Sequence, residues 1–319
     1  MKDRFNREIE YLRISIIDRC NLKCIYCAPE DCEDQMEAYN DLTAKEIESI
    51  VRSMAKVGIK KVRITGGEPL LRKDVHEIIE RIAHIPEIQD ISMTTNGINL
   101  DVMVEKLKKA GLKRLNISLD SLKEDKFHYI TGGGKLEKTL IGIEKALDVG
   151  LTPVKINMVV IKGVNDDEID DFIALSKDKP LEVRFIELMP IGAYGEHNLD
   201  KIIYNDSIIQ SHKELTYLKE QKKGQPAMYY HIDGYAGDIG FISPMTHQFC
   251  TTCNRIRLTS DGKIKPCLGN NGEVDIISIL RNNPENLDKL IYKTIFGKPP
   301  GHHFGKDFSS SRNMNRIGG

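Results

Sequence analysis

The sequence predicts an α/β fold, an incomplete (β/α)6 barrel followed by a smaller carboxyl-terminal α+β domain. Three observations support this prediction. The first two thirds of the chain alternate short β-rich runs with helical patterns. Each of the six β-rich runs has one apolar face and one polar or basic face. The alternation ends near residue 215, so we expect the TIM-like partial barrel over residues 1–215 and the second domain over residues 216–319.

The elements follow in order along the chain. The predicted strands are Tyr11–Ile17, Lys61–Thr65, Asp90–Asn96, Arg114–Leu119, Pro153–Ile161 and Leu181–Leu188. Three helix starts carry the capping-box spacing, at Thr43 with Glu46, Asp74 with Glu77 and Ser121 with Glu124. Glycines end two of the helical patterns, Gly58 the first and Gly150 the last. Strand–helix repetition of this kind predicts parallel strands joined by right-handed crossovers.

The polar faces of the strands predict the kind of ligand. The apolar stripes of the strands would pack under the helices. The opposite faces carry Arg13, Ser15, Arg63, Thr65, Ser92, Thr94, Asn116, Ser118, Lys155, Asn157 and Arg184. A buried charge needs a partner. We therefore expect a wide lumen that holds a large anionic ligand. The alternative, a sheet with one solvated face, fits less well because helices on every crossover should cover the sheet.

Composition limits the function classes. The chain has 319 residues, 40% of them hydrophobic and 29% charged, which is typical of a globular protein with a sizeable core. Its formal net charge of −1 gives no general attraction to nucleic acid or to membranes. The charged amino terminus does not resemble a secretory signal, and no segment approaches the roughly 20 apolar residues of a spanning helix. We expect a cytoplasmic protein without nucleic-acid or membrane partners.

Six of the seven cysteines form two tight groups, a spacing that favours metal binding over disulfides in a reducing compartment. Cys20, Cys24 and Cys27 directly follow the first predicted strand, where α/β barrels keep their active sites. Three thiolates on one loop can hold three irons of a cubane cluster and leave the fourth iron open to a small ligand. A structural zinc site is the alternative, but no fourth ligand has suitable spacing. Cys32 is left over as an ordinary thiol.

The second group contains Cys250, Cys253 and Cys267. Taken alone, this group favours zinc, with His247 as a candidate fourth ligand. Arg255 and Arg257 follow at once and point to the same side of an extended segment. Paired guanidinium groups suit phosphate or guanine recognition, although each arginine alone could also belong to a solvated strand.

The motifs together resemble a known family. "CNLKCIYC" resembles the signature of the radical S-adenosylmethionine enzymes, and "TGGEP" at residues 65–69 resembles the motif that holds the methionine amino group in these enzymes. The segments "LRISIIDRCN", "RITGGEPLLR", "MTTNG", "NISLDSL", "VKINMVV", "RFIELM" and "CTTCNRIRLTSDGKIKPCL", with a terminal Gly-Gly, follow the order found in the branch that acts in molybdenum cofactor biosynthesis. The resemblance extends over nearly the whole chain.

The resemblance implies a set of residue roles. Cys20, Cys24 and Cys27 would hold a 4Fe–4S cluster whose open iron binds S-adenosyl-L-methionine. Tyr26, Gly67, Ser118 and Met189 would line the S-adenosylmethionine site. Arg13, Arg63, Thr94, Lys155, Arg255 and Arg257 would bind GTP, the implied substrate. Cys250, Cys253 and Cys267 would hold a second 4Fe–4S cluster, and the Gly-Gly tail would reach toward the active site.

Other readings stay open at the level of sequence. The chain could be another radical enzyme with an auxiliary cluster that acts on a peptide, or a non-catalytic iron–sulfur or zinc protein that senses redox state. The implied chemistry also needs an electron donor, which the sequence does not identify. The oligomeric state is open, a homodimer included. "TGGGK" at residues 131–135 lacks the Ser or Thr of a P-loop, so we expect only a loop there.

Overall fold

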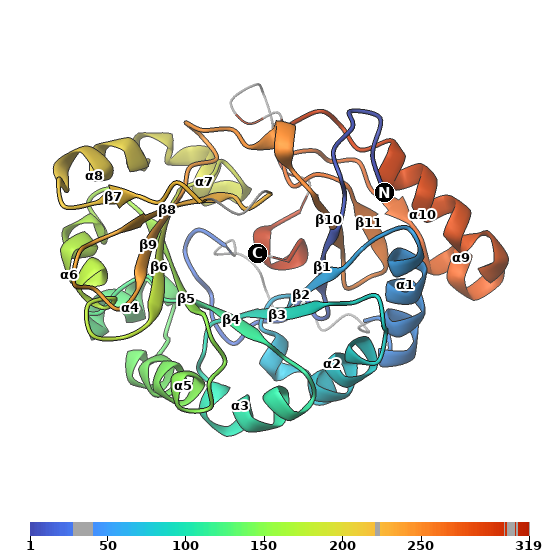
Figure 1. The fold of residues 1–319 in the computed structure, drawn as a ribbon, viewed down its shortest axis with the longest axis horizontal. Coiled ribbons are helices and arrows are strands. Elements are labelled where there is room, and N and C mark those ends of the chain that lie inside the picture. The colour runs from blue at the N-terminus through green and yellow to red at the C-terminus, as the bar shows by residue number, and fades with distance from the viewer. Residues whose placement is uncertain (28–40, 221–223, 303, 305–309, 311, 319) are drawn as a thin grey trace.

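The computed structural model describes residues 1–27, 41–220, 224–302, 304, 310 and 312–318. Within them, twelve strands form one mixed sheet that curves into an open barrel with helices around its outside (Figure 1). The incomplete barrel expected from the sequence is therefore confirmed.

The elements have the following bounds. The strands are β1 (Tyr11–Ser15), β2 (Lys61–Thr65), β3 (Asp90–Thr95), β4 (Arg114–Ser118), β5 (Val154–Val160), β6 (Leu181–Glu187), β7 (Thr216–Tyr217), β8 (Ala227–His231), β9 (Asp238–Ile242), β10 (Arg255–Leu258), β11 (Lys263–Lys265) and β12 (Val274–Asp275). The α-helices are α1 (Ala44–Lys56), α2 (Val75–Ala83), α3 (Leu100–Lys109), α4 (Glu124–Thr131), α5 (Leu136–Asp148), α6 (Ile169–Ala174), α7 (Gly192–His197), α8 (Asn205–Ser211), α9 (Ile277–Asn282) and α10 (Leu287–Phe296).

One of the three predicted capping boxes forms. The Glu46 amide donates to Thr43 Oγ1 at 3.2 Å, and the Thr43 amide donates to Glu46 Oε2 at 2.8 Å, so both orphan donors at the start of α1 are satisfied. The prediction at Asp74 is wrong, because its carboxylate accepts from Arg72 Nε at 2.7 Å and caps nothing. The prediction at Ser121 is also wrong.

Ser121 lies before the start of α4 and makes a longer-range contact. Its hydroxyl donates to the buried carboxylate of Glu168 at 2.8 Å instead of capping the helix. A buried, charged acceptor makes a stronger hydrogen bond than a backbone amide, so tertiary structure overrides the local pattern here.

The sheet has eight parallel strands at its centre. Strands β1 to β6 pair in sequence order. Strand β10 adds in parallel to β1 at one edge, and β9 adds in parallel to β6 at the other. The antiparallel strands β11 and β12 continue beyond β10, and β8 and β7 continue beyond β9. The last third of the chain thus extends both edges of the barrel.

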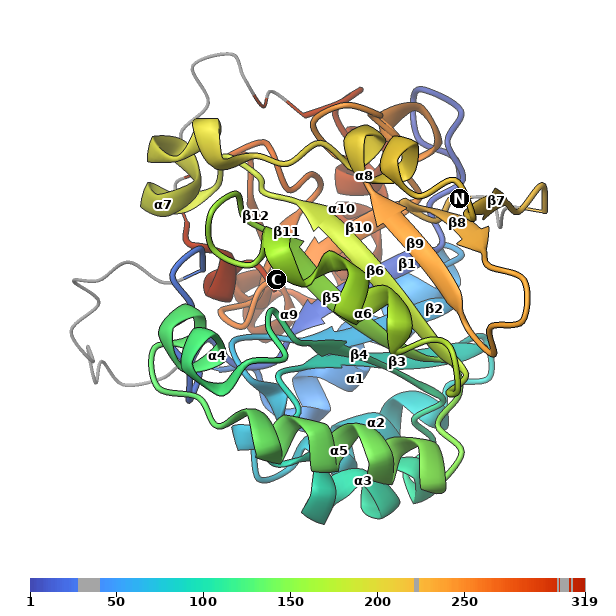
Figure 2. The same cartoon turned by 90° about the vertical axis from the view of Figure 1, so that its left-hand side faces the viewer.

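The predicted apolar stripes form the core. Leu12 and Ile14 of β1 and Val62 and Ile64 of β2 are fully buried between the sheet and the helices. Figure 2 shows α3 and α5 side by side against this outer face of the sheet. Met93 and Met158 are buried there too. The other face of each strand is therefore free to line a lumen.

The segment between β9 and β10, residues 243–254, has to cross the barrel. Both strands are parallel to the barrel strands, so this return segment runs from the carboxyl end of β9 to the amino end of β10. Its start is held by Glu187, which accepts from Thr246 Oγ1 at 2.7 Å. Near its end, the Asn254 carbonyl accepts from the Tyr11 amide at 3.2 Å. The first two cysteines of the second group lie in its latter half.

Among the residues placed by the structure, no helix is long and apolar enough to cross a membrane.

Candidate active site

The barrel encloses a cavity of about 610 Å³ that opens to solvent. All ten residues predicted to bind substrate or S-adenosylmethionine line it, namely Arg13, Arg63, Thr94, Lys155, Arg255, Arg257, Tyr26, Gly67, Ser118 and Met189. The thiols of Cys20, Cys24 and Cys27 open onto the same cavity, and so does Arg184. The structure therefore brings together side chains that are up to about 240 positions apart in the sequence.

Three arginines lie at one level on adjacent strands. The strand register pairs Arg13 with Arg257 on one side and with Arg63 on the other, and we call this set the arginine row. Burial, followed by the charges of Arg257 and Arg63, lowers the pKa of Arg13 well below its usual value. Burial and Arg255 lower the pKa of Arg257 to about 10. Such crowding of positive charge favours a bound anion, which would relieve the repulsion.

Two buried polar atoms, one in the row and one beside it, make no hydrogen bond within the described residues. Arg63 Nε and Thr94 Oγ1 have no partner among the described residues. An unsatisfied buried donor is costly and is a common mark of a ligand site. Arg184, by contrast, is fixed within the protein, since Nη2 donates to Asn116 Oδ1 at 2.6 Å and Nε donates to Asn157 Oδ1 at 2.8 Å.

Lys155 forms the other side of the lumen. Its ammonium pairs with Glu182 and donates to the Tyr229 hydroxyl at 2.9 Å. Burial and the nearby charge of Arg184 nevertheless lower the pKa of Lys155 to about 7, because the Glu182 carboxylate only partly offsets them. The charge on this lysine is therefore sensitive to pH and to any anion in the cavity.

The first cysteine group lies at the carboxyl end of β1, at one mouth of the cavity. The Cys27 amide donates to the Cys24 carbonyl at 2.9 Å, which closes the loop into a turn. Burial raises the pKa of Cys20 to about 11 and that of Cys27 to about 12. Without a bound cation these thiols are neutral, and a metal would displace their protons.

The Gly66-Gly67 turn packs against this loop. The Gly67 amide donates to the Ile17 carbonyl at 2.7 Å, and the Glu68 amide donates to the Arg19 carbonyl at 2.8 Å. A Cβ on Gly67 would lie 2.0 Å from the Arg19 carbonyl oxygen, so only glycine fits. The second glycine of the motif is thus required by backbone packing, whether or not it also contacts a cofactor.

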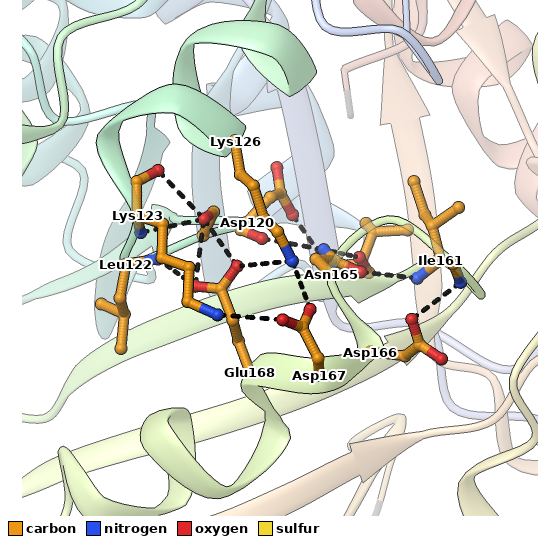
Figure 3. Close-up of polar contacts among 12 residues, drawn as sticks. Asp120, Leu122, Lys123, Lys126, Ile161, Asn165, Asp166, Asp167 and Glu168 are labelled. Carbon is orange, nitrogen blue, oxygen red and sulfur yellow. Dashed lines mark hydrogen bonds and ion pairs between the residues drawn. The ribbon is translucent and has the colours of Figure 1, made fainter.

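Tyr26, between two of the cysteines, is fixed by Asp120. Its hydroxyl donates to Asp120 Oδ2 at 2.7 Å, while Asp120 Oδ1 accepts from the Val159 amide at 2.8 Å. Figure 3 shows how Asn165, in the loop after β5, holds the backbone of Asp120 by donating to its main-chain carbonyl at 2.8 Å. The cysteine loop is therefore anchored to β4 and β5 as well as to β1.

The second cysteine group lies at the opposite end of the strands. Cys250 and Cys253 come just before β10, and Cys267 follows β11, which is antiparallel to β10 and ends beside its start. The Cys250 thiol interacts electrostatically with the thiols of Cys253 and Cys267. Burial opposes ionisation of Cys253, but Arg255 and Lys298 outweigh it and lower its pKa to about 7. No three His, Cys, Asp or Glu side chains in the described ranges surround a single point as the ligands of one metal ion.

The carboxyl-terminal tail lies inside the lumen, where Figure 1 shows it within the ring of strands. Arg257 Nη1 donates to the carbonyls of Ile317 and Gly318 at 2.9 and 3.1 Å. The Asn315 amide donates to the Cys27 thiol. Gly319 lies outside the described residues. The tail thus occupies the space between the arginine row and the first cysteine group.

Some functional candidates were missed from the sequence. Tyr11, Lys61 and Arg114 are the first residues of their strands, and each lines the cavity two positions before a predicted lumen residue. The same alternation, extended by one step, would have found them. Asp120 lies in the segment "NISLDSL", but nothing local in the sequence points to its hydrogen bond with Tyr26.

Two further residues of the sequence analysis, His247 and Cys32, remain to be placed. His247 bonds Asp206 at 2.9 Å, which argues against it as a fourth ligand of the second cysteine group. Cys32 lies outside the described residues.

Known proteins resemble this chain over its full length. A Radical SAM superfamily model matches residues 14–176, and a Molybdenum Cofactor Synthesis C model matches residues 181–304. The chain is 50% identical to a GTP 3′,8-cyclase of Alkaliphilus oremlandii and 48% identical to one of Clostridium botulinum, with 100% of each chain covered. It is 46% identical to the GTP 3′,8-cyclase of Listeria monocytogenes, with 100% and 99% covered.

The crystal structure of Streptococcus suis SuiB bound to S-adenosylmethionine shares the fold. The TM-score is 0.62 at 18% identity, and 91% of this chain and 68% of that chain are covered. An identity this low supports the barrel architecture alone. The full-length relatives and the two matching domains show that the chain belongs to the GTP 3′,8-cyclase family of the radical S-adenosylmethionine superfamily.

Proposed function

We propose that this chain converts GTP into (8S)-3′,8-cyclo-7,8-dihydroguanosine 5′-triphosphate, the first step of molybdenum cofactor biosynthesis. One observation supports this most strongly. The first cysteine group and the arginine row line one cavity, and the second cysteine group lies at the opposite end of the strands, next in sequence to the lining residues Phe249, Asn254 and Leu268. That arrangement suits a polyanionic nucleotide held between two metal clusters.

The cysteines fit two 4Fe–4S clusters. In such a cluster each thiolate binds a different iron, and three thiolates leave one iron available to a small ligand. Cys20, Cys24 and Cys27 would hold the cluster that binds S-adenosylmethionine, with Tyr26, Gly67, Ser118 and Met189 around that ligand. Cys250, Cys253 and Cys267 would hold the second cluster. When bound, the first cluster and S-adenosylmethionine would supply the one-electron, hydrogen-abstracting chemistry that joining C3′ to C8 of GTP requires.

The chain's own residues bind and orient the nucleotide. Arg13, Arg63 and Arg257, helped by Lys155, would neutralise the triphosphate by charge-assisted hydrogen bonds. Thr94 and the Nε of Arg63 would satisfy their buried polar atoms on the same ligand. Arg255 lies two residues after Cys253 and stacks over the Phe249 ring at 4.6 Å, a position suited to the guanine end. Fixing the two reacting carbons in register accounts for much of the catalysis.

The deciding experiment is anaerobic turnover. After cluster reconstitution, with a chemical reductant in place of the electron donor, 5′-deoxyadenosine is measured with and without GTP. We expect a strong rise with GTP and formation of the cyclised nucleotide. Equal, low release in both cases would retain the radical chemistry but contradict GTP as the substrate. A panel of peptides in the same assay tests for a peptide-modifying enzyme.

A binding experiment tests the GTP residues separately. Replacing Arg255 or Arg257 by alanine should weaken GTP binding about tenfold or more and leave the iron content unchanged, since each removes a charged contact worth about 1.5–3 kcal/mol. Equilibrium dialysis measures the affinity. Unchanged affinity in both variants would make these arginines structural.

A further inference from the structure

The amino-terminal residues fold into a small hairpin that holds one arginine rigidly. Lys2 and Glu8 form an antiparallel bridge, and Asn6 turns the chain with a φ of 64°. Asp3 Oδ2 accepts from Arg7 Nε at 2.6 Å, and both side chains are buried. The ion pair with Asp3 therefore fixes the orientation of the Arg7 guanidinium relative to the hairpin.

The remaining donors of Arg7 all bind backbone carbonyls from distant segments. Nη1 donates to the carbonyls of Cys250 at 3.0 Å and Pro300 at 2.9 Å. Nη2 donates to the carbonyls of Pro299 at 2.6 Å and Lys298 at 3.4 Å. An arginine has five N–H donors in a planar fork, and every one of them has a partner here. Arg7 thus joins the hairpin, the return segment and the chain after α10.

The segment that Arg7 holds, residues 298–300, also places the buried Lys298 next to the second cysteine group. Lys298 is 2% exposed, and its Nζ donates to the Pro266 carbonyl at 2.5 Å, one residue before Cys267. Its charge interacts with Cys253 and Cys267. A Cβ on Gly301, just beyond, would lie 3.5 Å from Cys250 Sγ, so this segment packs directly on the thiol.

We propose that Arg7 is a positioning residue for the second cluster. We propose further that Lys298 supplies a positive charge next to the cysteines that hold this cluster. Arg7 sets the distance between the Cys250 loop and residues 298–300, and Lys298 sets the position of Cys267. Three thiolates brought together in a half-buried site repel one another, and the charge of Lys298 offsets part of that repulsion. Arg7 is paired with Asp3 and acts by position. This inference rests on the proposed second cluster.

The test compares two conservative variants of the same hairpin. Arg7→Lys keeps the charge but has three donors on one nitrogen and cannot span the four carbonyls. Arg4→Lys is the matched control, because Arg4 is exposed and its guanidinium lies over the Phe5 ring. Iron per chain is measured after anaerobic reconstitution, together with the electron paramagnetic resonance spectrum of the reduced protein.

We expect about eight irons in the wild type and in Arg4→Lys, and about four in Arg7→Lys. The spectral change caused by S-adenosylmethionine should persist in Arg7→Lys, which shows that the first cluster and the barrel are intact. Eight irons and an unchanged second-cluster spectrum in Arg7→Lys would overturn the inference. Four irons in the wild type would instead contradict the second cluster itself.

Lys298→Gln tests the charge of Lys298 separately. It also provides a second test of the proposal if Arg7→Lys accumulates poorly. The amide can still donate to the Pro266 carbonyl but carries no charge. Loss of a neighbouring cation disfavours the reduced cluster, so its midpoint potential should shift to a lower value. A Cys20→Ala, Cys24→Ala, Cys27→Ala background isolates this signal. An unchanged potential would contradict the role of Lys298.

Discussion

The Thr94 hydroxyl should favour GTP binding but destabilise the folded protein. Its hydroxyl oxygen is buried beside the arginine row without a hydrogen-bond partner among the residues that the structure describes. Thr94→Val should raise the free energy of unfolding by about 1 kcal/mol, because an unsatisfied buried hydroxyl is removed. GTP affinity should fall about fivefold to tenfold, because the ligand loses that contact. Chemical denaturation and equilibrium binding measure the two effects.

Thr95→Val provides the control. Thr95 Oγ1 donates to Glu68 at 2.7 Å and accepts from the Gly97 amide at 3.0 Å, so its removal should destabilise the protein by at least about 1 kcal/mol. The two adjacent variants should change stability in opposite directions. A loss of stability in Thr94→Val would mean that the hydroxyl is satisfied within the protein.

Lys155 should make GTP binding depend on pH. Its pKa of about 7 in the free protein would be raised by a bound triphosphate, so affinity should be highest below pH 7 and fall by up to about tenfold per unit above it. The terminal phosphate, with a pKa of about 6, is already ionised in that range. Lys155→Arg keeps its charge and should flatten the profile. Kd values between pH 6.5 and 8.5 at constant ionic strength test this, and parallel profiles would contradict it.

The residues of the site were largely predictable from the sequence, for a physical reason. A strand places alternate side chains on opposite faces, so Arg13, Thr94 and Lys155 could be assigned to the lumen without any tertiary information. Asp120 could not be found, because its role depends on Tyr26, 94 positions away. Asp74 was misread because Arg72, two residues earlier, competes for its carboxylate.

At the scale of elements, the tail makes a specific prediction. Gly318 has a φ of 74°, and a Cβ there would lie 2.8 Å from Thr65 Cγ2. Gly318→Ala should lower turnover about tenfold through strain of roughly 1–2 kcal/mol, and leave the iron content unchanged.

Gly163→Ala is the matched control for the tail variant. Its φ is 71°, and nothing lies within 4 Å of the added Cβ, so it introduces similar strain without contact with the lumen. Turnover should stay close to the wild-type rate. Equal losses of turnover in the two variants would assign the effect to general destabilisation instead of to the tail.

The six strands from β1 to β6 were predicted to within two residues at either end, whereas β9 and β10 were not recognised as barrel strands. The first six pair with sequence neighbours, and each is separated from the next by a helical pattern. Strand β10 pairs with β1 across more than 200 residues, and no local pattern encodes such a pairing.

At the scale of the whole molecule, residues 1–215 should not fold into a stable barrel without the rest of the chain. A chain of residues 1–215 would expose β1 and β6 as open edges and remove Phe241, which stacks on Phe185 with ring centroids 5.7 Å apart. Unpaired hydrophobic edges promote aggregation. We expect this fragment to aggregate, as measured by light scattering after size-exclusion chromatography. A soluble monomer with native circular dichroism would show that the six-strand unit is independent.

The pairing of β10 with β1 has a consequence for what happens while the protein is being synthesised. The first thiol triad is complete once Cys27 has been synthesised, but roughly 240 further residues separate it from Cys267. At 5–20 residues per second that interval lasts on the order of 10–50 s. For nearly all of it, the arginine row lacks Arg257 and β1 lacks its outer neighbour, and the tail is made only afterwards. Iron that arrives early therefore meets an exposed half-site, and a cell in which oxygen is present has to protect the nascent chain for that time.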